Sequence, residues 1–480
     1  MTTGAAPGAP PAGERNTVPW ATAAALAGGV AGAAAFLSPE PGLLVLGAIA
    51  LAGCALVVLD ADWALYTIAA FAVLRLADIA TDFHGAPSLF QPLLAVAVVG
   101  IAARWAATGE RPSGAGRAAV LMAVWLLIGL ASLIVASAPG DGLTEAQVLA
   151  KDMTVAVVAG MLLQRTAALR GVVWVFIGGG TLIAGISVFQ FLTNGFSNNF
   201  LGFGQSAVMN IVGLTDDVRI SGPIGDANFY GQLLVMIIPL AVDRMMTEQK
   251  RLLKVAAGGA AALTTAAAVF TFSRGAALAL VVVAVIMLVL HPPKLWAVAA
   301  IAGVIAVTIP LLPPGYVERM TTLAQIGTVE GGTDASIRGR TSEIMAGMFM
   351  FLDHPLTGVG LGNYEDRYLE YASDLGLERR REEREPHSLY TEVAAETGIP
   401  GVVAFGAIIL SAFAALRRAR VRFREQGDDD TANLTRALAL SLVGYLITSL
   451  FLHMAFARFA WLVLGISLAA PALAERSALP

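Results

Sequence analysis

One histidine and three arginines are the residues of this chain whose types and positions could do chemistry. His387 lies where a long polar segment meets an apolar run, and histidine is the side chain that takes up protons near neutral pH. Arg75, Arg219 and Arg274 lie near the ends of other apolar runs. Isolated cations in such places are usually structural, but three of them on separate segments could converge on one anion. The pattern predicts an anion site beside a base.

The residues after Arg219 favour a tight backbone turn, because 221–225 contain two glycines and a proline. Asp226 or Asn228 can then cap the helix that follows. A helix N-terminus beside an arginine can bind an anion, which makes Asn228 a candidate for substrate binding. Arg274 is expected at the corresponding depth between two other apolar runs.

His387 also has polar neighbours. Ser388 and Tyr390 are candidates for substrate contacts, and Glu392 follows one turn later. The remaining histidines stand singly at the ends of predicted spans or helices, where a structural role is favoured; they are His84, His291, His354 and His453.

The composition indicates an all-α polytopic membrane protein. Hydrophobic residues make up 57% of the 480 residues and charged residues only 14%, against roughly 25% charged in soluble proteins. The apolar runs, about 17 to 21 residues long, can each cross roughly 30 Å of hydrocarbon. About fourteen spans are expected, or about twelve or thirteen if short runs pair as re-entrant or interfacial helices. They are 18–37, 42–59, 63–80, 87–103, 118–137, 147–163, 172–192, 226–243, 255–272, 276–291, 295–312, 398–416, 433–453 and 456–473.

Basic residues in the short loops predict the orientation. Alternate loops hold most of the arginines and lysines, whereas 38–41, 81–86 and 138–147 hold none. Both termini and the basic loops are therefore expected in the cytoplasm. The chain then divides into a disordered tail (1–17), a transmembrane bundle (18–312) with an outer loop (193–225), an extracytoplasmic helical domain (313–386) and C-terminal transmembrane helices (387–480).

The polar domain is expected to contain two helices. One opens at Gly339 and ends at His354, and the other covers 364–377. The glycine-rich stretch 357–364 between them lacks a preceding strand and a following Lys-Ser or Lys-Thr, so a structural turn is favoured over a nucleotide loop. The tyrosines of the second helix and the mildly apolar stretch 200–214 are expected along the membrane interface.

A series of short motifs occurs in a fixed order. They are Arg75-Leu76-Ala77-Asp78, Arg219-Ile220-Ser221-Gly222 with Asp226-Ala227-Asn228, Ser273-Arg274-Gly275, Gly339-Arg340, His354-Pro355-Leu356-Thr357-Gly358-Val359-Gly360, and His387-Ser388-Leu389-Tyr390 with Glu396-Thr397-Gly398-Ile399-Pro400-Gly401. In content and order the chain resembles the O-antigen ligase and Wzy-type polymerase superfamily of bacterial membrane glycosyltransferases. Where that family often has Asn after the histidine, this chain has Ser388.

The resemblance implies a GT-C-like bundle and an inverting transfer of a glycan from a polyprenyl-pyrophosphate carrier to an acceptor hydroxyl. The reaction would occur on the outer face of the bacterial plasma membrane, without a metal ion or another cofactor. Arg219 and Arg274, joined by Arg75 or Arg340, would stabilise the charge on the pyrophosphate leaving group. His387 would take the proton from the acceptor hydroxyl.

Other patterns argue for simpler roles. Asp60-Ala61-Asp62 matches the DxD pattern that binds a metal in several lipid-dependent glycosyltransferases, but its predicted cytoplasmic position favours helix capping. Zinc-protease, P-loop and serine-hydrolase motifs do not occur. The single cysteine, Cys54, excludes an internal disulfide.

Several functional alternatives remain open from the sequence. The acceptor could be a lipid-anchored core glycan, the growing chain or a protein hydroxyl, so both a ligase and a polymerase fit. A transporter or flippase of lipid-linked sugars would show paired broken helices and charges near the middle of the membrane. Only the set of candidate arginines with His387 argues against a non-catalytic assembly protein. Membrane lipid is an expected partner and nucleic acid is not, while the sugar, its linkage and the oligomeric state stay open.

Overall fold

The computed structural model describes residues 60–108, 114–210, 216–290, 335–375, 384–454 and 458–478. The tail 1–17, Cys54 and the expected spans 18–37, 42–59 and 295–312 lie outside them. The elements of the first half are α3 (Ala61–Leu74), α4 (Leu76–His84), α5 (Phe90–Thr108), α6 (Gly116–Ser132), η1 (Leu133–Val135), α7 (Pro139–Leu162), α8 (Thr166–Leu192), η2 (Phe200–Gly202), β1 (Gln205–Asn210) and β2 (Asp216–Gly222). Those of the second half are α9 (Ala227–Thr247), α10 (Arg251–Phe270), α11 (Arg274–Leu290), α14 (Ala335–Asp353), α15 (Tyr364–Leu375), α16 (Leu389–Glu425), α17 (Asp429–Thr448) and α18 (Arg458–Arg476).

The prediction of an all-α polytopic membrane protein is confirmed. Within the described ranges, six helices are long and apolar enough to cross a membrane, and a seventh span results if the bent pair α3 and α4 is counted as one. The six are α6 with η1, α8, α9, α10, α16 and α18. The expected span 63–80 is therefore a helix broken at Arg75, where the two parts meet at 51°.

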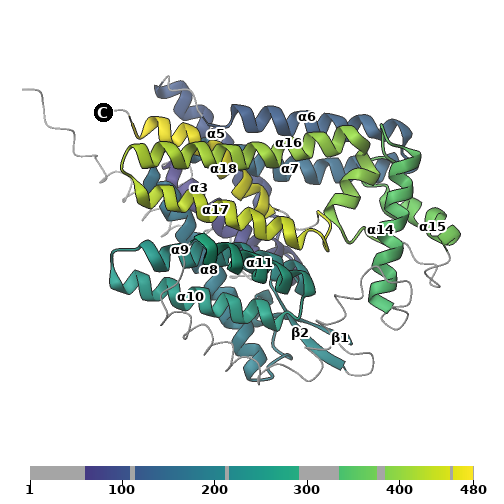
Figure 1. The fold of residues 1–480 in the computed structure, drawn as a ribbon, viewed down its shortest axis with the longest axis horizontal. Helices are drawn as coiled ribbons and strands as arrows, with labels where there is room; N and C mark the ends of the chain where they lie inside the picture. Colours follow the sequence, from purple (N-terminus) through teal and green to yellow (C-terminus); the bar gives the residue numbers. More distant parts are fainter. Residues whose placement is uncertain are drawn as a thin grey trace, which may run out of the picture.

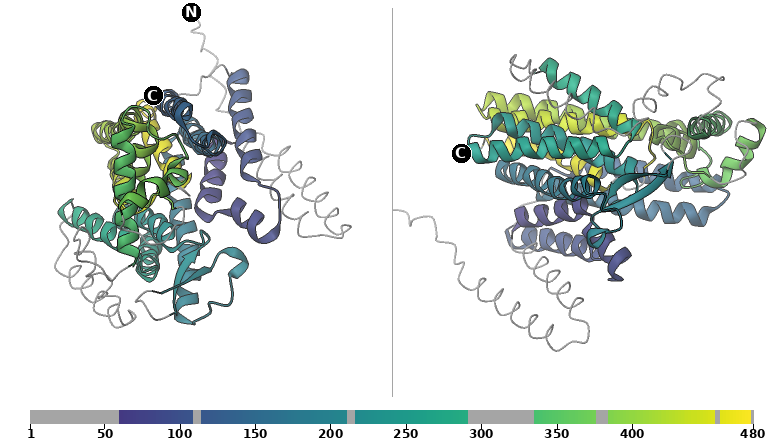
Figure 2. Two further views of the ribbon diagram at one scale, coloured as in Figure 1. Left: turned by 90° about the vertical axis from the view of Figure 1, so that its right-hand side faces the viewer. Right: turned by 90° about the horizontal axis from the view of Figure 1, so that it is seen from below.

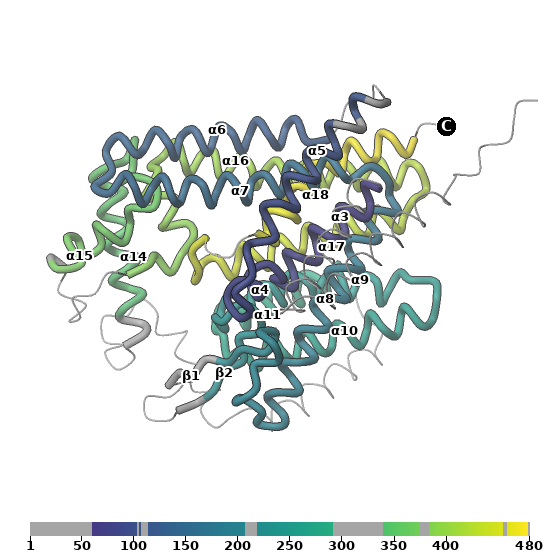
Figure 3. The backbone as a smooth tube through the Cα atoms, turned by 180° about the vertical axis from the view of Figure 1, so that it is seen from behind, coloured from purple at the N-terminus to yellow at the C-terminus, as the bar shows by residue number. Residues whose placement is uncertain are grey.

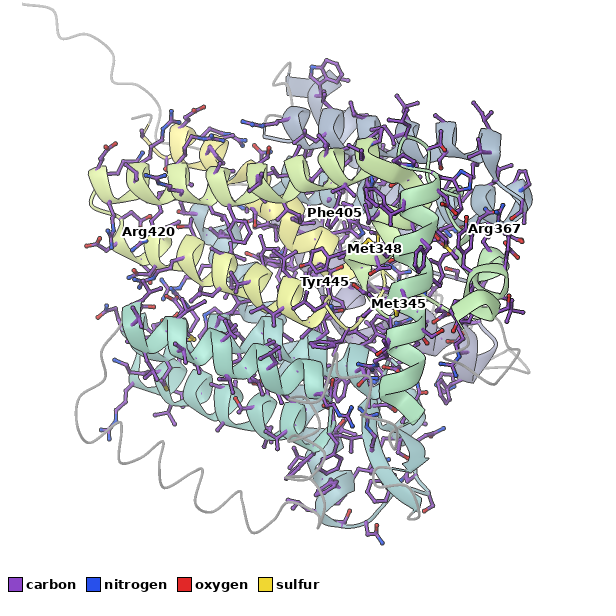
Figure 4. The ribbon with its side chains drawn as sticks, turned by 45° about the vertical axis from the view of Figure 1, so that its right-hand side comes forward. Met345, Met348, Arg367, Phe405, Arg420 and Tyr445 are labelled. Carbon is purple, nitrogen blue, oxygen red and sulfur yellow. The ribbon has the colours of Figure 1, made fainter. Side chains whose placement is uncertain are left out.

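The long helices run side by side, and α14, α15 and the β1–β2 hairpin lie at one end of them (Figure 1). The two turned views also show this arrangement (Figure 2). Arg420 of α16 lies at the opposite end from Arg367 of α15 (Figure 4). This arrangement agrees with a hairpin and a helical domain on one side of the membrane and a basic loop on the other.

α9 is the central helix of the bundle. Its residues from Leu233 to Ala241 are all buried, and it packs on α8, α10, α11 and α17. Gly444 of α17 permits a close approach, because a Cβ atom there would lie 2.8 Å from Cγ1 of Val235. Ser441 of α17 donates a hydrogen bond to the carbonyl of Met236 nearby. Small residues and interhelical hydrogen bonds of this kind are how helices associate in lipid.

The other layer of the bundle contains α6, α7, α16 and α18. Trp125 of α6 stacks on Trp461 of α18 at 5.8 Å and contacts Phe405 of α16 at 5.2 Å between ring centroids. Aromatic pairs at these distances contribute about 0.5–1.5 kcal/mol beyond their buried area. From behind, α3, α4 and α5 lie across the bundle (Figure 3), with α3 packed on α8 and α7.

α16 is broken near its start, at Gly398, and the break joins the bundle to the helical domain. Gly398 has φ 62°, a left-handed conformation that favours glycine. The break lets Ile399 N donate to Pro355 O at 2.8 Å, while Val359 N donates to Ala395 O at 2.8 Å. Two of the motifs in the sequence, 354–360 and 396–401, therefore contact each other. The structural interpretation of the glycine-rich turn is confirmed.

The outer loop contains a hairpin that the sequence did not predict. Residues 200–214 were expected along the membrane interface, but 205–210 form β1, which pairs antiparallel with β2 so that Ala207 opposes Arg219. Pairing satisfies the backbone hydrogen-bonding groups of a segment that is not helical. Asp226 caps α9 by accepting from Asn228 N at 2.7 Å and Phe229 N at 3.0 Å, as expected.

Both helices expected in the polar domain are present as α14 and α15, but the expected position of the tyrosines is wrong. Tyr364 and Tyr368 are 1% and 0% exposed. Their hydroxyl groups donate to the Glu343 carbonyl and to Ser342 Oγ on α14. A buried tyrosine needs such a partner for its hydroxyl, and α14 supplies it. These rings pack the two helices together.

The DxD sequence has the capping role that its position suggested. Asp60 caps α3 by accepting from Asp62 N at 2.9 Å. Asp62 forms an ion pair with Arg165 at the start of α8, with 2.5 Å between Oδ2 and Nη2.

Candidate functional site

His387 is held between two acidic residues of different segments. Its Nδ1 lies 2.9 Å from Oε2 of Glu343 on α14 and 3.2 Å from the backbone oxygen of Glu385. Glu343 is 1% exposed, and its Oε1 accepts from Nη1 of Arg384 at 3.0 Å. The side chain of His387 is 40% exposed, so it remains accessible to a substrate.

The neighbours of Nδ1 determine which ring nitrogen of His387 is basic. A carbonyl oxygen and an ionised carboxylate can only accept hydrogen bonds. Nδ1 therefore carries the hydrogen, and the Glu385 carbonyl is its hydrogen-bond acceptor. Nε2 is left as the nitrogen that can take up a proton.

Glu343 is charged at neutral pH although it is buried. Burial alone would raise the pKa of its carboxyl group. The contacts with His387, and then with Arg384, outweigh burial and hold the pKa below its ordinary value of 4.5. The carboxylate can therefore stabilise an imidazolium at His387.

The residues after His387 are anchored to the 449–454 loop, which connects α17 toward α18. Leu389 N donates to Ser449 O at 3.0 Å and to Leu452 O at 2.7 Å. Ser388 caps α16 by accepting from Thr391 N, and the Tyr390 hydroxyl donates to Leu446 O at 2.7 Å. The two substrate-binding candidates beside His387 thus have structural partners of their own.

The buried side chain of Arg219 connects three elements of the structure. It lies in β2 and is 2% exposed. Its Nε donates to Thr271 O at the end of α10 at 2.7 Å, and its Nη2 donates to Asn228 Oδ1 in the first turn of α9 at 2.9 Å. The predicted association of Arg219, Asn228 and the α9 N-terminus is therefore present.

Arg274 lies three residues beyond the carbonyl that Arg219 contacts. It opens α11 and is 8% exposed. The corner that precedes it turns at Phe272, which has φ 51°. The two arginines are therefore brought to one corner of the bundle, where the start of α9 meets the α10–α11 turn.

Arg340 reaches the same region from α14. Its guanidinium carbon lies 6.0 Å from the centroid of the Phe451 ring, a cation–π distance. The Phe451 ring also packs on Gly275, where a Cβ atom would lie 3.1 Å from Cδ2. Phe451 thus connects the Arg274–Gly275 corner with α14.

His453 connects the arginine corner with His387. Its ring lies 5.1 Å from that of Phe229, the neighbour of Asn228, and 6.3 Å from that of His387, between centroids. Burial, followed by the charge of His387, lowers the pKa of His453 to about 4. The ring is neutral at pH 7, so its 3.2 Å contact from Nε2 to Glu385 Oε2 is a hydrogen bond rather than an ion pair.

Arg75 has different neighbours from the candidate arginines of the bundle corner, Arg219 and Arg274. It occupies the break between α3 and α4 with φ 52°, and its Nε forms an ion pair with Asp78 Oδ2 at 2.8 Å. Arg458 of α18 lies 3.4 Å from the same oxygen. Both arginines line a cavity of about 400 Å³ that also reaches Pro386 and His453.

A comparison with known protein families finds a match over part of the chain. Residues 259–406 match the protein-family model described as O-antigen ligase. This part of the chain is therefore similar to O-antigen ligases. The resemblance found in the motifs is thereby confirmed. No curated protein matches the chain.

The matched region contains part of the candidate site. Arg274, Arg340 and His387 lie within the matched residues, whereas Arg75 and Arg219 lie before them. The match supports, at the level of the family, a membrane glycosyltransferase of the O-antigen ligase or polymerase type.

Three residues of the site were not predicted. Glu343 and Phe451 carry no motif that marks them, and His453 was interpreted as structural. Membrane topology could have pointed to Phe451 and His453. The predicted orientation puts the end of the span 433–453, where they lie, on the same side as His387.

Proposed function

We propose that this protein is an inverting glycosyltransferase that polymerises or ligates surface polysaccharide. It moves a glycan from a polyprenyl-pyrophosphate carrier to an acceptor hydroxyl on the outer face of the bacterial plasma membrane, the side to which the proposal assigns α14 and the hairpin. The observation that carries the proposal is the environment of His387. Its Nδ1 contacts the Glu385 carbonyl and the Glu343 carboxylate, and the 449–454 loop joins it to the arginine corner.

His387 is the general base of the proposed reaction. Nε2 takes the proton of the acceptor hydroxyl while that oxygen forms a bond to the anomeric carbon of the donor. The bond between the anomeric carbon and the phosphate oxygen breaks, and its electron pair leaves with polyprenyl pyrophosphate. Attack from the opposite face inverts the anomeric configuration. The buried Glu343 carboxylate stabilises the imidazolium that results.

Arg219 and Arg274 bind the pyrophosphate as negative charge develops on it. Thr271 O and Asn228 Oδ1 fix the plane of the Arg219 guanidinium before the donor arrives. Preorganised cations of this kind stabilise a leaving group without reorganising during the reaction. The phosphates would also lie near the N-terminus of α9, whose dipole favours an anion.

A transporter of lipid-linked sugars is the second candidate. It is favoured by two broken helices, the α3–α4 pair at Arg75 and α16 at Gly398. The break in α16, however, bonds to Pro355 of the helical domain, at the end of the bundle instead of its middle. That position favours catalysis at a surface over transport through the centre.

The test is a turnover assay with full-length protein in lipid, with chelator and a polyprenyl-pyrophosphate glycan present. Release of polyprenyl pyrophosphate is followed for the wild type, for His387→Ala and for a matched control, His84→Ala, at the exposed end of α4. We expect release by the wild type and the control only. Equal release by His387→Ala would remove His387 from the mechanism, and movement of intact donor across the bilayer without release would establish the transporter.

A further inference from the structure

The cavity beside His387 has a strongly acidic wall. It is lined by seven carboxyl groups but only two guanidinium groups. The carboxyl groups belong to Asp78, Glu145, Asp152, Glu365, Glu385, Glu392 and Glu396, and the guanidinium groups to Arg75 and Arg458.

The two arginines of the cavity are engaged by carboxylates of the same wall. Arg75 pairs with Asp78 at 2.8 Å, and Arg458 lies 3.4 Å from Asp78 and 3.5 Å from Asp152. Their charges are therefore compensated locally. Carboxyl groups therefore outnumber the guanidinium groups that could bind an anion, and this balance disfavours an anion in the cavity.

Two of the other carboxyl groups, both on α16, accept hydrogen bonds from the backbone. Glu392 Oε2 accepts from Met454 N at 2.8 Å, and Glu396 Oε1 accepts from Tyr364 N at 3.3 Å. Glu145 of α7 also lines the cavity. In the part of the chain that the structure describes, no three acidic, histidine or cysteine groups are arranged to hold a metal ion. Spaced oxygen acceptors of this kind match the hydroxyl groups of a sugar.

The cavity reaches the candidate base. Glu385 and Pro386, the two residues before His387, form part of its wall, and so does His453, whose ring is 6.3 Å from that of His387. The arginine corner lies beyond His453, against Phe229. A sugar in the cavity would therefore approach the base from a region that disfavours the pyrophosphate of the donor.

We propose that this cavity is the acceptor-sugar subsite and that its carboxyl groups select uncharged or amine-bearing sugars against phosphorylated or acidic ones. The assignment of this sugar as the acceptor depends on the glycosyltransferase activity proposed above. The volume, about 400 Å³, lies in the range of small-molecule sites. Carboxylates accept hydrogen bonds from hydroxyl groups and attract an ammonium group, whereas a second anion there would be repelled.

Direct binding of small sugars tests the proposal without any donor. Glucosamine, methyl glucoside and glucose 6-phosphate are cationic, neutral and anionic probes built on one ring, and their affinities for full-length protein in lipid can be measured by saturation-transfer NMR. We expect the first two to bind about tenfold or more tighter than the phosphate. Failure of all three probes to bind, or equal binding of glucose 6-phosphate, would overturn the proposal.

Two cavity variants locate the binding. Val148→Trp fills the cavity from α7 and should weaken binding of both favoured probes about tenfold. Glu145→Gln keeps the shape but removes one charge, and should reduce the preference for glucosamine over glucose 6-phosphate severalfold. The control is Asp366→Asn, at an exposed position of α15 outside the cavity. It should change neither the affinity of the favoured probes nor the preference for glucosamine over glucose 6-phosphate. Unchanged binding in both cavity variants would place the sugar elsewhere and refute the subsite.

The turnover assay separates this proposal from the proposed function. Val148→Trp should raise the KM for acceptor while leaving the affinity for polyprenyl pyrophosphate unchanged. Selective sugar binding by a protein that releases no polyprenyl pyrophosphate would support a sugar site and reject the glycosyltransferase. An unchanged KM for acceptor in Val148→Trp would support the glycosyltransferase and reject this subsite.

Discussion

The buried Glu343 carboxylate lies against the half-exposed His387 imidazole, with 2.9 Å between Oε2 and Nδ1. The same helix, α14, carries Arg340 one turn earlier, so one element positions both the carboxylate beside His387 and the cation over Phe451. This relationship makes α14 a positioning element for the proposed base.

The first prediction concerns Glu343→Gln. The amide keeps the shape but removes the charge that stabilises a protonated His387. We expect kcat to fall by about one to two orders of magnitude with little change in the KM for donor. The acid limb of the pH–rate profile should move to lower pH, because the ring becomes a weaker base. The control is Glu370→Gln, in an exposed ion pair of α15. An unmoved profile would leave Glu343 with a structural role only.

The second prediction concerns the two buried arginines. Arg274→Ala and Arg219→Ala should each raise the Kd for polyprenyl pyrophosphate about tenfold or more. Arg219→Ala should also destabilise the fold by about 1–3 kcal/mol for each partner left without a donor, Thr271 O and Asn228 Oδ1. Ligand titration and thermal unfolding separate the effects. Arg251→Ala, at the exposed start of α10, is the control. Wild-type donor affinity in both variants would contradict an anion site at this corner.

The third prediction is a loss of stability in mild acid caused by His453. Its folded pKa, about 4, lies below its ordinary value of 6.5, so the unfolded chain binds more protons between these values. Stability should therefore fall as pH drops from about 6.5 toward 4, by about 2 kcal/mol between pH 7 and 4.5. The groups around the ring are Glu385, His387, Asp226 and Glu343.

Thermal unfolding from pH 7 to 4.5 checks this prediction. Glu343 loses its contribution mainly below its ordinary pKa of 4.5, which is the lower limit of this window, because the folded state holds that pKa still lower. His453→Gln can still donate to Glu385 but does not titrate, and should flatten the slope. The exposed His84→Gln should keep the wild-type slope. Identical slopes in all three proteins would show that another group causes the acid sensitivity.

The fourth prediction compares two glycines of α16. A Cβ atom at Gly398 would lie 2.6 Å from Pro355 O, at φ 62°. Gly398→Ala should therefore destabilise the junction with α14 by about 1–3 kcal/mol and lower kcat. Gly406→Ala, where no atom lies within 4 Å of the new Cβ, should be neutral or stabilising by up to about 1 kcal/mol. Measurements of unfolding temperature and of turnover check this prediction. Equal stability and equal kcat in the two variants would show that the break at Gly398 does not position the helical domain.

The sequence predicted the helices because the necessary information is local. The length of an apolar run identifies a membrane-crossing helix such as α8 or α16. Asp226 caps α9 through atoms two and three residues away, so its type and position were enough. The motifs also predicted the family, and they named His387 and the arginines as candidates.

Only the tertiary structure decided which of these residues meet and what surrounds them. The hydrophobic period of a helix indicates a buried face but not the partner of that face. For this reason Tyr364 and Tyr368 are core residues instead of interface residues, and Glu343 reaches His387 without any motif. The acidic cavity is formed by side chains from α3, α4, α7, α16 and α18, with residues of the helical domain. Their proximity is fixed by long-range packing, which no stretch of sequence contains by itself.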